Sequence, residues 1–287
     1  MTIIILGSSG FLGRALISKL ELKKIKFKGM VKQKNKIKRK YFFGDITKEN
    51  FLEKHISDND IIINLIGQNN KDTSKLFEQN VKGAFNLLNS IIKKKNIKVI
   101  FASTIMLYNE NVKNPSKESD TINPTTNYQI VKALTENIYH FYSKIFGIDV
   151  TVLRFSNVYG PNKKTGIISN CLKSIKKNKP ITIDHNGNQV RDFLYIDDAI
   201  ESIIKSISSH TKGYNLLNIS SGTGIQIKKI IGMIEDVSKK KIPVNFTSEK
   251  FDKKNLVANN IKAKKLIKFT PKTDIHEGLG QTILSRK

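Results

Sequence analysis

An apolar strand pattern, three glycines and a helical pattern open this chain, and this order constrains the fold more than any other feature. Residues 2–6 read Thr-Ile-Ile-Ile-Leu, then come Gly7, Gly10 and Gly13, and a helix is predicted over 11–24. Glycines at such a junction allow a tight turn, a close approach of the backbone to a pyrophosphate and close helix packing. The spacing is Gly-x-x-Gly-x-x-Gly, so an ordinary strand–helix turn is the alternative. The pattern predicts a dinucleotide-binding site.

Strand-like and helix-like patterns alternate through the first half of the chain. Apolar β-branched runs predict strands, and apolar residues at helical spacing predict helices. The expected strands are 2–6, 27–31, 41–43, 61–65, 99–103 and 150–155, and the expected helices are 11–24, 73–94 and 126–146. This alternation indicates an α/β fold, in which a Rossmann-type, doubly wound parallel sheet is covered by helices on both faces.

The pattern becomes irregular after Pro161, where short segments are separated by turn signals such as Asn186-Gly187-Asn188. This change predicts a smaller C-terminal α/β lobe. We expect a dinucleotide-binding domain over 1–160 and the lobe over 161–287, with part of 190–220 returning to the first domain. A helix capped by Asp274 is expected near the end of the chain.

Composition excludes several classes of protein. The net charge is +26, but the lysines are spread along the whole chain, so we expect no specific nucleic-acid partner. No apolar run approaches the roughly 20 residues of a membrane span. Cys171 is the single cysteine, and the five histidines have no metal-ligand spacing, so we expect neither a disulfide nor a metal site. These features fit a cytoplasmic protein.

Tyr128 and Lys132 are the strongest candidates for catalysis. They lie four residues apart in a helical pattern and therefore share one helix face. A phenol beside an ammonium group provides an acid/base near neutral pH. Together with a dinucleotide site, this pair predicts redox chemistry at a carbon that bears oxygen.

The residues at the end of the second predicted strand should contact the 2′-position of the cofactor's adenosine ribose. An acid there would bind the ribose hydroxyl and repel a 2′-phosphate. Residues 30–34 contain no acid, and Lys32 could receive the phosphate. The cofactor is therefore NAD(P), with NADP(H) favoured, unless Lys32 is only one more surface lysine. Asp45, after the third strand, either binds the adenine amine or caps the turn at Thr47.

Several motifs occur in the order of a known family. They are Gly7–Gly13, Asn80-Val-Lys-Gly83, Ser103-Thr104 with Tyr108, Tyr128-x-x-x-Lys132, the segment 154–161 (Arg-Phe-Ser-Asn-Val-Tyr-Gly-Pro) and the segment 191–198 (Arg-Asp-Phe-Leu-Tyr-Ile-Asp-Asp). With these motifs the chain resembles the extended short-chain dehydrogenase/reductases, in their nucleotide-sugar epimerase/dehydratase branch. The resemblance covers essentially the whole chain, but it does not specify the sugar.

The resemblance implies a role for each matching position. Tyr128 is the acid/base, Lys132 lowers its pKa and holds the nicotinamide ribose, and Thr104 hydrogen-bonds the reacting sugar oxygen. The implied cofactor contacts are Gly7, Gly10, Phe11, Leu12, Gly13, Lys32, Asp45, Ile46, Tyr128 and Lys132. The implied contacts of the nucleotide-sugar substrate, which the C-terminal lobe binds, are Asn80, Asn157, Arg191 and Lys250.

Arg191 is also singled out by composition, because only five residues of this lysine-rich chain are arginines. An arginine suits the bidentate recognition of a diphosphate, and a pair with Asp192 or Asp197 is the alternative. Arg154, at a strand end, is interpreted as structural.

Two departures from the family pattern narrow the chemistry. Sugar dehydratases of this branch carry an acidic pair directly after the Ser/Thr, where this chain has Ile105 and Met106, so dehydration is not expected. The second phosphate-binding arginine is missing, and Lys250 stands in its segment.

The sequence therefore predicts an NAD(P)-dependent epimerase of a nucleotide-activated sugar, similar to UDP-glucose 4-epimerase, that works through a transient 4-keto intermediate. An NADPH-dependent ketoreductase of a nucleotide-activated deoxysugar is the first alternative. A non-catalytic dinucleotide sensor on the same fold is the second. Family members often pair two long helices from each subunit, so the helices at 73–94 and 126–146 predict a homodimer.

Overall fold

Seven parallel strands form the central sheet. The computed structural model describes residues 1–32, 40–67, 72–108, 115–184, 186–247 and 255–285. The sheet has the order β10-β6-β5-β4-β1-β2-β3, and its strands are β1 (Ile3–Leu6), β2 (Phe27–Val31), β3 (Tyr41–Phe43), β4 (Ile61–Asn64), β5 (Lys98–Thr104), β6 (Asp149–Phe155) and β10 (Tyr214–Ile219). The strand order changes direction between β1 and β4, so the predicted Rossmann-type, doubly wound sheet is confirmed.

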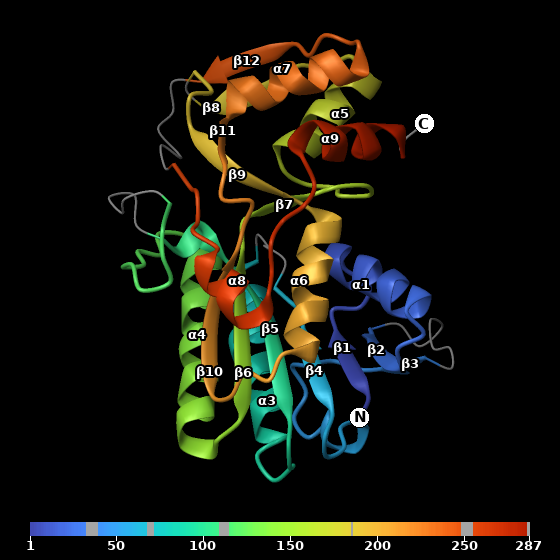
Figure 1. Ribbon diagram of the computed structural model, residues 1–287, viewed down its shortest axis with the longest axis vertical. Coiled ribbons are helices and arrows are strands. Elements are labelled where there is room, and N and C mark those ends of the chain that lie inside the picture. The colour runs from blue at the N-terminus through green and yellow to red at the C-terminus, as the bar shows by residue number, and fades with distance from the viewer. Residues whose placement is uncertain (33–39, 68–71, 109–114, 185, 248–254, 286–287) are drawn as a thin grey trace.

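The two faces of the sheet are buried under different helices, and alternate residues of β1 supply both cores. Ile3 and Ile5 belong to one hydrophobic core with α1 (Phe11–Leu22) and α6 (Ile196–Ser208). Ile4 and Leu6 belong to the other core with α3 (Gly83–Asn89) and α4 (Asn127–Phe146). Because successive side chains of a strand point to opposite faces, an uninterrupted run of Ile and Leu is what a sheet covered on both faces requires. Figure 1 shows these helices on either side of the strands.

A capping box sets the start of helix α4, and a glycine sets its end. The Thr126 hydroxyl accepts from the N–H of Gln129, and the Gln129 side chain accepts from the N–H of Thr126, which makes a capping box. The helix ends at Gly147, whose φ of +66° is a left-handed conformation that glycine adopts without strain. The sequence expectation of a helix over 126–146 agrees with the structure to within its N-cap residue.

The predicted helix over 73–94 is interrupted and shorter. Helix α2 (Thr73–Phe77) passes into a π-helical turn over Glu78–Lys82 and then into α3, which ends at Asn89. Within the π-helical turn, the Asn80 side-chain amide donates to the Leu76 carbonyl at 2.8 Å and so competes for a backbone acceptor. Such π-bulges often mark functional sites, and Asn80 is one of the predicted site residues.

A smaller lobe lies beyond the carboxyl ends of the large sheet's strands (Figure 1). Its strands form a three-stranded sheet, β11-β9-β7, and a parallel pair, β12-β8. Its elements are β7 (Asn157–Tyr159), α5 (Ile167–Lys177), β8 (Ile181–Asp184), β9 (Val190–Tyr195), β11 (Gly224–Gln226), α7 (Ile227–Ser238), β12 (Val244–Thr247) and α9 (Ile275–Leu284). Asp274 caps α9 as expected, because its side chain accepts from the N–H of His276. Helix α8 (Ile261–Ile267) packs against β10 of the large sheet.

Candidate active site

The turn after β1 forms a glycine cradle at the start of α1. Gly7 has a φ of +82°, and the N–H of Gly10 donates to the Gly7 carbonyl at 3.0 Å. A Cβ on Gly13 would lie 2.2 Å from the Gly7 oxygen, so only glycine fits there. Gly10 precedes Phe11, the first residue of α1, and has no side chain that could occupy the first N–H groups of the helix. This arrangement fits the pyrophosphate of a dinucleotide, and the role of Gly7, Gly10 and Gly13 in binding it stays a prediction.

Lys32 and Asp45 meet beyond the ends of β2 and β3. The Lys32 ammonium lies 3.8 Å from Asp45 Oδ1, which also accepts from the N–H and the hydroxyl of Thr47 at 3.0 Å each. Asp45 therefore caps its own turn, which was one of the two alternatives left open by the sequence. Ile46 is fully buried under the sheet, and its carbonyl accepts from the side chain of Asn86.

Lys132 is held at the carboxyl ends of β4 and β5. Its ammonium donates to the Ala102 carbonyl at 2.8 Å and to the Ile66 carbonyl at 3.3 Å, and it lies 4.5 Å from the centre of the Phe101 ring. Only 2% of the residue is exposed. Burial lowers the pKa of Lys132 to about 7, while the Glu136 carboxylate acts in the opposite direction.

Tyr128 lies one helical turn before Lys132, and its ring packs beside Leu76 and Val131. Burial raises the pKa of Tyr128 to about 12, opposite to the direction expected from a neighbouring ammonium, because desolvation disfavours the phenolate. Thr104 ends β5 two residues after the carbonyl that binds Lys132, and its hydroxyl accepts from the N–H of Met106. Helix α4 packs against the turn that follows Thr104.

Asn80 and Gly67 complete the surroundings of Lys132. A Cβ on Gly67 would lie 2.1 Å from Lys132 Nζ and 2.8 Å from Asn80 Oδ1, so both polar atoms approach one small space. Asn80 Oδ1 is buried and has no hydrogen-bond partner among the described residues. A buried acceptor of this kind fits a site that takes a polar ligand or a water. Sequence reasoning missed Gly67, although a glycine three residues after the end of a buried strand was a usable signal.

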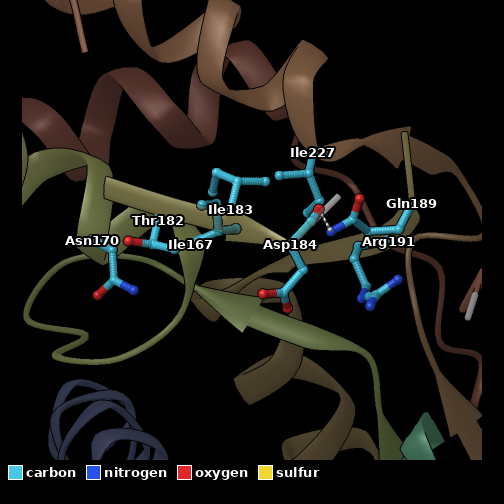
Figure 2. Close-up of a pocket in the computed structure, with 8 residues that line it drawn as sticks. All are labelled: Ile167, Asn170, Thr182, Ile183, Asp184, Gln189, Arg191 and Ile227. Atoms are coloured by element: carbon cyan, nitrogen blue, oxygen red, sulfur yellow. Dashed lines mark hydrogen bonds between the residues drawn. The ribbon is translucent and has the colours of Figure 1, made fainter. Parts of the chain in front are cut away.

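Arg191 lines a pocket of about 180 Å³ in the lobe. The pocket combines apolar, polar and charged side chains: Ile167, Asn170, Thr182, Ile183, Asp184, Gln189, Arg191 and Ile227. In Figure 2, Arg191 and Gln189 lie at one end of the pocket, Asn170 and Thr182 lie at the other, and Asp184 lies between them. The Arg191 guanidinium donates to the Val190 carbonyl at 2.9 Å.

Asp192 and Asn157 tie the strand of Arg191 to its surroundings. Asp192 is fully buried, and its carboxylate accepts from the N–H and hydroxyl of Ser221 and from the N–H of Gly222. Asn157 donates to the Asp192 carbonyl at 3.1 Å and therefore lies beside the strand that carries Arg191. The structure thus places Asn157 and Arg191 together on the lobe sheet. Lys250 lies outside the described residues.

The described part of the chain contains no group of three His, Cys, Asp or Glu side chains that could hold a metal ion. Within the same residues, no helix combines the length and the apolar character that crossing a membrane requires.

A doubly wound sheet with a glycine turn before α1 and a Tyr-x-x-x-Lys helix is the architecture of the short-chain dehydrogenase/reductase class. The sequence profile of the NAD dependent epimerase/dehydratase family matches residues 3–220, and the chain belongs to that family.

Three similar proteins indicate the chemistry of the family. The chain is 32% identical over 187 residues to YtcB of Bacillus subtilis, described as an uncharacterized UDP-glucose epimerase, covering 64% of this chain and 58% of that protein. It is 32% identical over 210 residues to the UDP-glucuronate 4-epimerase of Thermodesulfobacterium geofontis, and the match covers 72% of this chain and 64% of that protein. The matches thus span less than two thirds of these two relatives. The crystal structure of the Bacillus cereus UDP-glucuronic acid 4-epimerase, in complex with UDP-glucuronic acid and NAD, superposes with a TM-score of 0.87 at 26% identity and covers 99% and 98% of the two chains.

Proposed function

We propose that this protein is an NAD(P)-dependent 4-epimerase of a UDP-activated sugar. The observation that carries the proposal lies at the end of β5: the Ala102 carbonyl accepts from the Lys132 ammonium, Thr104 follows two residues later, and Tyr128 lies one helical turn before Lys132 on α4. Ile105 and Met106 follow Thr104, and neither can transfer a proton, which argues against a dehydratase. The epimerase names of the similar proteins support the same reaction.

In this mechanism Tyr128 moves the proton of a sugar hydroxyl. Thr104 hydrogen-bonds the same oxygen, and the carbon becomes the ketone of a transient 4-ketosugar. NAD(P), when bound, supplies a reversible hydride acceptor, and its oxidised ring adds a positive charge. Because burial raises the pKa of Tyr128 to about 12, the phenol holds its proton tightly, and positive charge nearby is needed to form the phenolate that accepts the sugar's proton. Lys132 is the residue of this chain that provides such charge.

The lobe pocket is our proposed site for the nucleotide part of the substrate. Its isoleucines offer flat apolar walls to a base, and Asn170, Thr182 and Gln189 offer hydrogen bonds at its edges. Arg191, at the opposite end from Asn170, suits the diphosphate. Asn157, bound to the neighbouring strand, is the second proposed contact.

Lys32 supports NADP(H) as the cofactor and keeps the ketoreductase as the second candidate. Its ammonium lies at the end of β2, where a 2′-phosphate would bind, 3.8 Å from Asp45 Oδ1. A reductase releases its cofactor in each cycle, whereas an epimerase keeps it. The complete Tyr128, Lys132 and Thr104 set argues against a sensor, which has no use for a proton donor.

The test is incubation with UDP-glucose, UDP-N-acetylglucosamine, UDP-glucuronic acid and their available 4-keto-6-deoxy derivatives, with and without NADPH. We expect two hydroxyl epimers to interconvert while the NADPH absorbance stays constant. Stoichiometric NADPH consumption with a ketosugar would establish the reductase instead. Bound cofactor without turnover of any nucleotide sugar would point to the sensor.

The outer face of α4 is our proposed homodimer interface. Large apolar side chains are exposed on this helix and on the neighbouring α2 and α3, namely Phe77, Phe85, Ile130, Leu134, Phe141 and Ile145. Their number on one face is more than scattered surface residues explain. We expect a dimer by light scattering at micromolar concentration, and a monomer for Phe141→Glu. Leu22→Glu, an equally apolar exposed position on α1, is the matched control and should remain dimeric.

A further inference from the structure

A buried ion pair lies directly behind the Lys132 site. Arg154 Nη2 lies 2.7 Å from Glu136 Oε2, and Arg154 Nε donates to Glu136 Oε1 at 3.0 Å. The two side chains are only 4% and 5% exposed. Burying two charges costs much of what their attraction returns, so stability alone is a weak reason to keep such a pair.

The ion pair is attached to the strand end that carries the proposed chemistry. Ser103 and Arg154 are register partners on β5 and β6, and the Ser103 hydroxyl donates to Glu136 Oε1. On either side of Ser103, the Ala102 carbonyl accepts from Lys132 and Thr104 carries the proposed sugar-binding hydroxyl. Three consecutive residues of β5 therefore belong to this site: Ala102 binds Lys132, Ser103 binds Glu136, and Thr104 is the proposed sugar contact.

Glu136 also shares a helix face with Lys132, because the two residues lie four apart on α4. The charged and titratable groups around Lys132 and this ion pair are Tyr128 and Glu136 on α4, Arg154 on β6, Tyr108 after β5 and Tyr214 on β10. Among these groups Glu136 is the one acidic residue, and Glu118 acts on Tyr108 from the segment that follows it. Its carboxylate raises the pKa of Lys132 against the effect of burial.

We propose that Glu136, fixed by Arg154 and Ser103, is a positioning residue that keeps the Lys132 ammonium charged and holds Thr104 in register. The proposal rests on the proposed function only for the role of Lys132 in turnover. Glu136 itself touches no reacting atom in this scheme. Arg154, read from the sequence as structural, becomes the partner that fixes the carboxylate.

Titration of Lys132 tests the proposal without any sugar. The full chain is labelled with [13Cε]lysine, and the Lys132 resonance is assigned as the one missing from Lys132→Met. In Glu136→Gln we expect the Lys132 midpoint about one pH unit lower, because an opposite charge is lost and Arg154 is left uncompensated. Glu235→Gln, which removes the carboxylate of the Glu235–Lys241 pair in the lobe, is the matched control and should leave the midpoint unchanged.

A second variant keeps the test valid if the single variant folds poorly, since an unpaired buried Arg154 is destabilising. Glu136→Gln combined with Arg154→Met removes both charges. We expect its Lys132 midpoint to lie between those of the single variant and the native chain. A midpoint equal to the native one in both variants would overturn the proposal and leave the pair purely structural.

Turnover separates this proposal from the proposed function. If the protein epimerises a UDP-sugar, Glu136→Gln should lose activity at lower pH than the native enzyme, because Lys132 loses its charge earlier as pH rises. If the Lys132 midpoint moves but no nucleotide sugar turns over, the electrostatic role of Glu136 stands and the proposed function fails. A moved midpoint with an unmoved pH profile would overturn the positioning role in catalysis.

Discussion

The sheet half and the lobe build their sites in different ways. In the sheet half, each group sits on one short segment: the glycines on one turn, Tyr128 and Lys132 on one helix, and residues 102–104 on one strand end. In the lobe, the pocket takes its lining from α5, β8, β9, the connection between those strands and α7. In the function that we propose, the comparison teaches that the reacting groups are positioned by local segments, whereas substrate binding depends on how distant segments are assembled.

The two halves also differ in the size of their sheets. The seven-stranded sheet is buried on both faces by two hydrophobic cores. The lobe contains sheets of three and two strands. If this contrast has the functional meaning that we propose, substitutions in one half should change turnover and substitutions in the other should change binding.

Tyr128→Phe should have the largest effect and should leave the lobe untouched. We expect the rate to fall at least about 100-fold, because a positioned acid/base is lost. Cofactor binding and the KM for the nucleotide sugar should stay near native values. Tyr142→Phe, on the same helix but bonded to Asn89, is the control. Near-native turnover by Tyr128→Phe would remove Tyr128 from the mechanism.

Arg191→Ala should give the opposite pattern, because it weakens the lobe site and spares the sheet half. The loss of a charge-assisted contact of about 1.5–3 kcal/mol should raise KM roughly 10- to 100-fold. Fluorescence titration should show unchanged cofactor binding. The KM of Arg191→Lys should lie between those of the native protein and Arg191→Ala, because lysine keeps the charge and loses the bidentate geometry. A KM that does not change would make Arg191 structural.

Lys32→Asp should have the smallest effect and acts within the sheet half alone. Its side chain is 49% exposed, so solvent screens the contact. We expect a shift of cofactor preference toward NAD(H) of roughly tenfold or less, measured as the ratio of Kd values for NADP and NAD, because a carboxylate repels a 2′-phosphate. Lys28→Asp on the same strand should leave the ratio unchanged. An equal ratio in both variants would show that Lys32 is an ordinary surface lysine.

Most of the sheet half could be predicted because its signals are local. The runs at 2–6 and 61–65 are strands buried on both faces, and Thr126 with Gln129 marks the start of α4 within four residues. The interior of the predicted helix over 73–94 was wrong because its π-helical turn accompanies a side-chain contact of Asn80, which no periodicity reports.

Two features of the site could not be read from the sequence because they depend on burial. An acid four residues after a lysine resembles a surface ion pair, so Glu136 gave no sign that it is buried against Arg154. The direction of the pKa of Tyr128 was missed because burial raises it, and the sequence does not report how deeply that phenol is buried. In the lobe, β8 pairs with β12 and β9 pairs with β11. Each strand is far along the chain from its partner, so no local sequence pattern indicates the pairing.

The path of the chain between the halves has an evolutionary consequence. After β9 the chain returns to the large sheet as α6 and β10, goes back to the lobe through β11, α7 and β12, packs α8 on β10 and ends in the lobe with α9. A fragment that stops at residue 160 would lack the strand that pairs with β6 and the helix that covers one core, and would expose a bare sheet edge. The halves therefore cannot be inherited or exchanged as separate cassettes. If the lobe pocket is the substrate site that we propose, this threading favours substitutions within the pocket over exchange of a whole module as the route to a new substrate.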